Sequence, residues 1–170
     1  MSADPSWTYF GRTAGTTARG DDFAFRDHVA QMELANVDRD VAAADHWLGR
    51  MATTTFTVGF CLGGALSWRQ SAANPGLAGC VGFYGKPERA RDVIPDMKAP
   101  VLVLAAGQDR TPISEVEAFA ADVRAGGTEA DLHVYPDAPH SFFDRRFDDY
   151  EEECADAWRR ILGFIDAHTG

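Results

Sequence analysis

The pattern of hydrophobic and polar positions divides the chain after residue 25 into alternating helix-like and strand-like segments. Apolar residues recur every three to four positions from about 26 to 50, which predicts a helix. The run 101–104 is continuously apolar, as is typical of a parallel strand covered on both faces. Further short runs predict strands at 54–58, 78–84 and 130–135.

Three more segments have helical periodicity. One runs from 62 to 73 and is stopped by Asn74-Pro75-Gly76, and a second begins with Thr111 as N-cap and Pro112 at the first helical position. The third runs from about 149 to 167. We expect its buried face to hold the apolar residues Tyr150, Cys154, Trp158, Ile161, Leu162 and Ile165.

This alternation of helices and strands predicts a three-layer α/β fold with about four parallel strands. The strands are expected to be parallel because their connections are long enough for crossovers. Residues 1–25 are turn-rich and show no period, so we expect an irregular lead-in there. We expect the 170 residues to form a single domain, 1–170.

The most specific motif is Gly59-Phe60-Cys61-Leu62-Gly63, which follows a predicted strand and has the form G-x-nucleophile-x-G. Such a nucleophile stands on a strained turn where no Cβ fits at the flanking glycines. The turn would place the sulfur at the N-terminal end of the next helix, which lowers the pKa of a thiol. The pentapeptide alone also fits a buried structural cysteine on a glycine-rich turn.

Two further polar residues follow predicted strands: Asp109 after 101–104, and His140 after 130–135. In parallel sheets the active site lies outside the carboxyl ends of the strands. The chain order Cys61, Asp109, His140 is the order that an α/β-hydrolase requires. Taken singly, Asp109 also fits a turn or a helix cap, and a lone loop histidine is usually incidental. Together the three residues predict a catalytic triad.

Composition narrows the function classes. A net charge of −10 disfavours binding to nucleic acid or to an anionic membrane surface. No apolar run approaches the ~20 residues needed to span a bilayer, and the N-terminus lacks the features of a secretory signal. Three cysteines without CxxC spacing argue against a disulfide framework and a zinc site. We therefore expect a cytoplasmic protein without metal or cofactor, and its oligomeric state stays open.

The motifs together resemble the dienelactone hydrolase family of the α/β-hydrolase superfamily. The resemblance rests on residues 59–65, 83–85, 107–109 and 139–142, and it extends well over about 54–168 and loosely over 5–50. It implies hydrolysis of a small ester or lactone, with carboxymethylenebutenolide as the type substrate of the family.

The resemblance also implies a role for each residue of the triad. Cys61 would attack the ester carbonyl, His140 would relay protons, and Asp109 would orient the imidazole and stabilise its charge. The backbone N–H of Leu62 would be one oxyanion donor.

Members of the family hold anionic substrates with arginines. Arg12 and Arg145 stand near the matching positions, although surface arginines are the ordinary interpretation of both. We expect Tyr84 to form a wall of the pocket.

The chain departs from the family pattern in its number of strands. A whole hydrolase of this type has about eight strands, and we expect the missing ones before residue 1, together with the loop that supplies the second oxyanion donor. One edge of strand 54–58 would then be unpaired and prone to aggregation, unless another chain pairs with it.

Three hypotheses about function follow. The leading one is a thiol-dependent hydrolase of small esters or lactones. The second is an inactive or degenerate α/β-hydrolase fragment, because an oxyanion hole with Leu62 N–H alone would lose roughly 10²–10³ in rate. The third is a redox or glyoxalase-like protein with a cysteine elbow, which gives no role to Asp109 and His140.

Overall fold

The computed structural model describes residues 10–15 and 22–170, which fall into two compact units, Met1–Ala44 and Asp45–Gly170. The expected irregular lead-in lies partly outside the described residues, at 1–9 and 16–21. Its described part contains one short helix, α1 (Gly11–Ala14). The expectation of a single domain stays a prediction.

The segment predicted as one helix over 26–50 is two helices, α2 (Phe25–Ala30) and α3 (Leu34–Leu48). The first helix ends at Ala30, and the next residue, Gln31, donates from both its backbone N–H and its side-chain amide to the carbonyl of Asp27. A new helix begins beyond it, where the side chain of Glu33 accepts a hydrogen bond from the Asn36 amide at 3.0 Å. Local side-chain bonds at 31–36 therefore interrupt a continuous apolar period.

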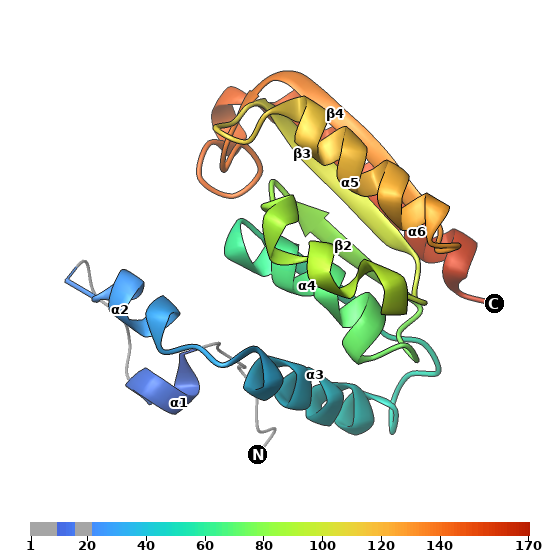
Figure 1. Cartoon of the computed structure of the whole chain (residues 1–170). Helices are drawn as coiled ribbons and strands as arrows, with labels where there is room; N and C mark the ends of the chain where they lie inside the picture. The colour runs from blue at the N-terminus through green and yellow to red at the C-terminus, as the bar shows by residue number, and fades with distance from the viewer. Residues whose placement is uncertain (1–9, 16–21) are drawn as a thin grey trace. The chain divides into compact units, whose positions relative to one another are not determined.

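In the second unit four strands form one parallel sheet in the order β1-β2-β3-β4 (Figure 1). This confirms the predicted α/β fold with four parallel strands. The two later strands run four residues beyond their predicted ends, and their pairing resumes after an irregularity between Ala106 and Gln108. The strands are β1 (Phe56–Phe60), β2 (Gly79–Phe83), β3 (Val101–Gln108) and β4 (Ala130–Pro139).

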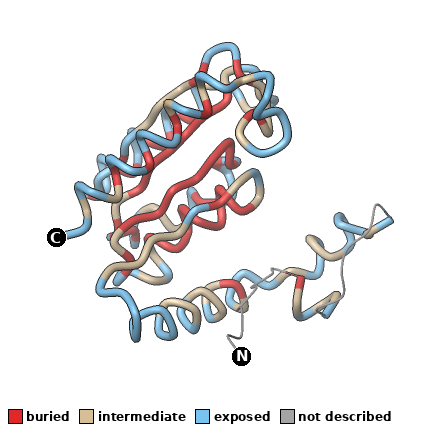
Figure 2. The backbone as a smooth tube through the Cα atoms, turned by 180° about the vertical axis from the view of Figure 1, so that it is seen from behind, coloured by how far each residue is buried: buried red, intermediate tan, exposed pale blue. Residues whose placement is uncertain are grey.

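Helices cover both faces of this sheet, which gives the three predicted layers. On one face lie α4 (Leu62–Ala73) and α5 (Ile113–Ala125), joined by Trp68 and Phe119, whose ring centroids are 5.1 Å apart. On the other lies α6 (Glu151–His168) (Figure 1). The buried residues follow the strands and the sheet-facing sides of the helices (Figure 2). The 3₁₀ turns η1 (Pro87–Arg89), η2 (Arg91–Asp96) and η3 (Phe147–Asp149) complete the connections.

Two expectations about the helices are wrong. Trp158 and Leu162 of α6 are 54% and 44% exposed, because the buried stripe runs through Cys154, Ala157, Ile161 and Phe164. At α5, Thr111 does not cap the helix: Pro112 is the N-cap residue and makes no side-chain cap bond.

None of the described helices is long and apolar enough to cross a membrane.

Strand β1 has a hydrogen-bonded neighbour only on the β2 side within the described residues. Val58 in the middle of this strand is 47% exposed. An apolar strand with one free edge is a template for pairing with another chain. The predicted open edge is therefore present in the described sheet.

We predict that Val58→Lys reduces concentration-dependent self-association, because a charged side chain on an edge strand opposes strand-to-strand pairing. The measurement is light scattering over a protein concentration series. Ala121→Lys, which adds the same charge on the exposed side of α5, is the matched control and should behave like the parent chain. Equal association of the Val58→Lys and parent chains would show that the β1 edge is not the contact.

Candidate active site

Cys61 stands on a sharp turn between β1 and α4. Its backbone has φ 54° and ψ −116°, outside the regions that non-glycine residues ordinarily occupy. A Cβ at Gly59 would overlap the backbone carbonyl of Gly63, so the first glycine of the motif is required by the close approach of the turn. The Cys61 N–H donates to the carbonyl of Phe83 at 3.1 Å. The local geometry is that of a nucleophile elbow.

The environment of Cys61 favours its thiolate. A hydrogen bond with His140 is the largest cause of a lowered pKa at this thiol, and the positive charge of His140 and the backbone N–H of Leu62 lower it further. Partial burial and the charge of Asp109 act in the opposite direction. Cys61 is exposed, whereas Cys80 and Cys154 are buried. Burial raises the pKa of Cys80 to about 12 and also raises the pKa of Cys154, so of the three thiols only that of Cys61 has a lowered pKa.

Asp109 and His140 form the second half of the site. The strands β3 and β4 end immediately before them, and Nδ1 of His140 lies 2.7 Å from Oδ2 of Asp109. The aspartate side chain is only 12% exposed, and its Oδ1 accepts the backbone N–H of Arg110 at 2.6 Å. Since Nδ1 is engaged by Asp109, Nε2 is the ring nitrogen available to the sulfur. The hydrogen bond with Cys61, followed by the bond with Asp109, raises the pKa of His140 to about 9.

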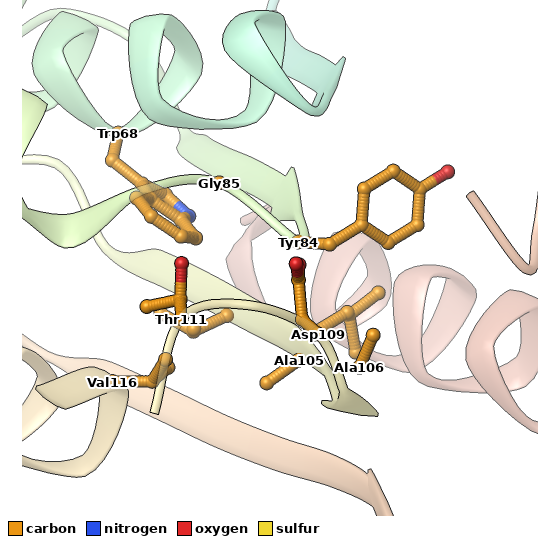
Figure 3. Close-up of a pocket in the computed structure, with 10 residues that line it drawn as sticks. Trp68, Tyr84, Gly85, Ala105, Ala106, Asp109, Thr111 and Val116 are labelled. Atoms are coloured by element: carbon orange, nitrogen blue, oxygen red, sulfur yellow. The ribbon is translucent and has the colours of Figure 1, made fainter. Parts of the chain in front are cut away.

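A small hollow is lined in part by Asp109 (Figure 3). Its volume is about 10 Å³, which is space for roughly one water molecule. Trp68 of α4 and Thr111 contribute to its walls, and Figure 3 shows the Tyr84 side chain pointing away from it. The hollow is too small for an ester substrate, so its walls serve to pack the acid rather than to bind a ligand.

Tyr84 and Leu62 lie beside these residues. The Tyr84 ring centroid is 4.9 Å from that of His140, and its hydroxyl donates to Asp144 at 2.7 Å. Leu62 is the first residue of α4, and its backbone N–H lies close enough to the Cys61 sulfur to lower the thiol pKa. Tyr84 thus lies beside His140 and Leu62 beside Cys61, and their roles as pocket wall and oxyanion donor stay predictions.

The two arginines predicted to bind substrate, Arg12 and Arg145, each lie next to an aspartate. Arg12 pairs with Asp40, with Nε 3.1 Å from Oδ2. The side chain of Arg145 is 83% exposed, and its Nε lies 4.0 Å from Asp144. Arg12 belongs to the first compact unit and Arg145 to the second, and each is described here only by the aspartate that it pairs with. The substrate-binding roles of both arginines stay predictions.

Sequence reasoning missed Asp144 as a partner of the site. It lies four residues after His140, in a turn where an aspartate has no distinctive spacing. It also missed the aromatic packing beside the elbow, where Phe60 stacks on Phe143 with centroids 5.8 Å apart. The only available signal was the run Ser141-Phe142-Phe143-Asp144, which is unusually aromatic for a loop.

Comparison with known proteins places this geometry in a family. The model of the dienelactone hydrolase family matches residues 8–169. The chain is similar to proteins named "Putative carboxymethylenebutenolidase" from Salmonella typhi and from Escherichia coli K12, at 34% and 36% identity over 156 residues. Each alignment covers 84% of this chain and 58% of the relative, so the chain spans less than two thirds of the length of these curated relatives.

Solved structures give the same result. A "Putative Dienelactone Hydrolase" from Klebsiella pneumoniae superimposes with a TM-score of 0.79 at 30% identity, covering 93% of this chain and 72% of that one. An esterase from Pyrococcus furiosus superimposes with a TM-score of 0.62 at 18% identity and shows the shared fold. The elbow, the strand order and the family match lead to one conclusion: the chain belongs to the dienelactone hydrolase family.

Proposed function

We propose that this chain is a thiol-dependent hydrolase of small esters or lactones, of the carboxymethylenebutenolidase type, in which Cys61, His140 and Asp109 form the catalytic triad. One observation carries the proposal. Nδ1 of His140 lies 2.7 Å from Oδ2 of Asp109 at the ends of β3 and β4, and His140 is the largest cause of the lowered pKa of the exposed Cys61 thiol at the end of β1. Such an arrangement activates a nucleophile and returns its proton to a leaving group.

The reaction proposed for this site has two halves. The Cys61 thiolate attacks the carbonyl carbon, and the carbonyl electron pair moves to oxygen, which the Leu62 N–H stabilises. The tetrahedral intermediate collapses to a thioester as His140 gives its proton to the departing alkoxide or enolate oxygen. Neutral His140 then takes a proton from water, the resulting hydroxide attacks the thioester, and the thiolate leaves as the acid product forms. Asp109 holds Nδ1 throughout, which keeps Nε2 directed at the reacting atoms.

The substrate class rests on the relatives and on the walls beside the sulfur. The names of the curated relatives indicate a lactone with an enol ester bond. Phe60 and Phe143 are only partly buried and stack beside the elbow with ring centroids 5.8 Å apart, which gives an aromatic surface there. An unsaturated, planar ring fits such a surface better than a flexible aliphatic chain. The whole activity remains a proposal for a chain that spans 58% of these relatives.

A redox or glyoxalase-like role is the alternative from another class. It uses Cys61 alone and assigns nothing to the Asp109–His140 bond of 2.7 Å. Full activity in a His140→Ala variant would favour it.

We expect Cys61→Ala to reduce turnover of p-nitrophenyl acetate to the background rate, because the attacking atom is removed. His140→Ala should lower kcat/KM by roughly 10²–10⁴, the usual contribution of a general acid–base. His133→Ala, a histidine on β4 away from the sulfur, is the matched control and should keep parental activity. Turnover that survives both Cys61→Ala and His140→Ala would remove the triad from the mechanism.

Asp109→Asn is expected to keep the fold and lose up to about 10⁴ in kcat, because an amide no longer stabilises the imidazolium and favours the wrong tautomer. Circular dichroism checks the fold, and steady-state kinetics checks the loss. Asp137→Asn, an exposed change on the same strand end as His140, serves as the control. A loss of less than tenfold in Asp109→Asn would contradict the proposed role.

The pKa shifts predict a bell-shaped pH profile of kcat/KM. Activity should rise as pH passes the lowered pKa of Cys61, because the thiolate forms there, and fall above about 9, because His140 loses the proton that the leaving group needs. Alkylation by iodoacetamide, which needs only the thiolate, should show the rise without the fall. In His140→Ala the midpoint of alkylation should move to higher pH. An unmoved midpoint would show that His140 does not activate the sulfur.

A further inference from the structure

A hydrogen bond joins two segments that are 60 residues apart in the sequence and both reach the site. The hydroxyl of Tyr84, at the end of β2, donates to Oδ1 of Asp144 at 2.7 Å. Asp144 belongs to the turn that begins at His140, four residues earlier. The bond therefore ties the segment carrying the histidine to the strand next to the elbow.

The Tyr84 side chain is fixed at both of its ends. Its backbone has φ 36°, a left-handed conformation that a bulky residue holds only when its surroundings impose it. The backbone N–H donates to the carbonyl of Leu104 at 2.8 Å, and the hydroxyl is held by Asp144. Between these anchors the ring lies 4.9 Å from the His140 ring. A ring held in this way limits the positions that the imidazole can take.

The turn after His140 needs such a restraint. Ser141 has φ 64°, a second left-handed non-glycine residue, directly after the histidine. Phe142 is fully buried, whereas the side chain of Asp144 is 39% exposed. Beyond Asp144 the Arg145 side chain extends into solvent. The Tyr84–Asp144 bond is thus a polar anchor between the buried Phe142 and an exposed end of the turn.

We propose that Tyr84 and Asp144 are positioning residues that hold the His140 imidazole beside Cys61. The inference rests on the proposed function, because it assigns His140 as the base that activates Cys61. It adds to that function a pair of side chains that act through the histidine and not on the substrate.

The protonation state of Tyr84 suits this role. Burial, and after it the hydrogen bond with Asp144, raises the pKa of the phenol above its ordinary value. The hydroxyl therefore stays a donor over the pH range in which the thiolate forms. The anchor does not come apart where the enzyme would work.

The test uses four variants of the anchor and one matched control. Tyr84→Phe removes only the donor, Asp144→Ala removes the acceptor, and Asp144→Asn keeps an acceptor oxygen. The double variant Tyr84→Phe with Asp144→Ala completes the cycle. Tyr135→Phe is the control, because Tyr135 makes the same kind of bond to Asp156, at 3.0 Å, between β4 and α6.

The main measurement is the pH midpoint of Cys61 alkylation by iodoacetamide, with the modified residue identified by peptide mapping. It needs no substrate and reports the hydrogen bond from His140, the largest cause of the lowered thiol pKa. Tyr84→Phe and Asp144→Ala should each raise the midpoint and lower kcat for p-nitrophenyl acetate by roughly two- to tenfold with KM unchanged, the effect of one lost hydrogen bond. The double variant should lose no more than either single one. Asp144→Asn and Tyr135→Phe should keep the parental midpoint.

The outcomes separate this inference from the proposed function. Parental midpoints in Tyr84→Phe and Asp144→Ala would overturn it, as would losses that add in the double variant, or an equal loss in Tyr135→Phe. If the parent chain alkylates with a low midpoint but hydrolyses no ester, the proposed function fails, while the effect of Tyr84→Phe on the midpoint still tests the anchor.

Discussion

The hydrogen bond from the Cys61 N–H to the carbonyl of Phe83 is the interaction on which the arrangement of the site depends. The carbonyl that accepts this bond belongs to the last residue of β2, and the N–H that donates it lies between β1 and α4. One residue later the chain bends at Tyr84, whose own N–H is bound to Leu104 of β3. The elbow, the aromatic wall and the strand that leads to Asp109 are therefore set in register by two consecutive backbone bonds. A parallel sheet supplies such bonds only at strand ends, which is why the chemistry collects there.

The pKa of Cys61 is lowered in a chain whose net charge of −10 opposes the formation of a thiolate. The long-range field is screened by salt within about 10 Å, so nearby groups decide the ionisation. His140 contributes most, and the N-terminal N–H of α4 adds to it. Asp109 would repel a thiolate if it faced the sulfur alone. Because Nδ1 of His140 donates to Asp109 at 2.7 Å, the aspartate stabilises the positive charge of the imidazole, which is the partner of the sulfur.

The strands and helices around the site could be predicted from the sequence, because short-range sequence signals specify where they begin and end. The helix expected over 62–73 begins and ends as predicted, since the elbow precedes it and Asn74-Pro75-Gly76 stops it. The positions of Asp109 and His140 at the edge of the sheet followed from the predicted ends of the strands before them. The prediction that Trp158 and Leu162 lie on the buried face of α6 was wrong. Helical periodicity alone does not show that the small residue Ala157, and not its larger neighbour Trp158, packs against the sheet. Asp144 was not recognised, because its partner Tyr84 is 60 residues away and only the folded chain joins them.

The strands of the sheet differ in length in a way that bears on local unfolding. β3 and β4 have 8 and 10 residues and share a long ladder, whereas β1 has 5 residues and one described neighbour. Backbone amides of a short edge strand exchange with solvent through openings that leave the central ladder closed. In such an opening Cys61 departs with β1 while the Asp109–His140 bond stays assembled at the ends of β3 and β4. The candidate site would then come apart at a lower free energy than the fold itself.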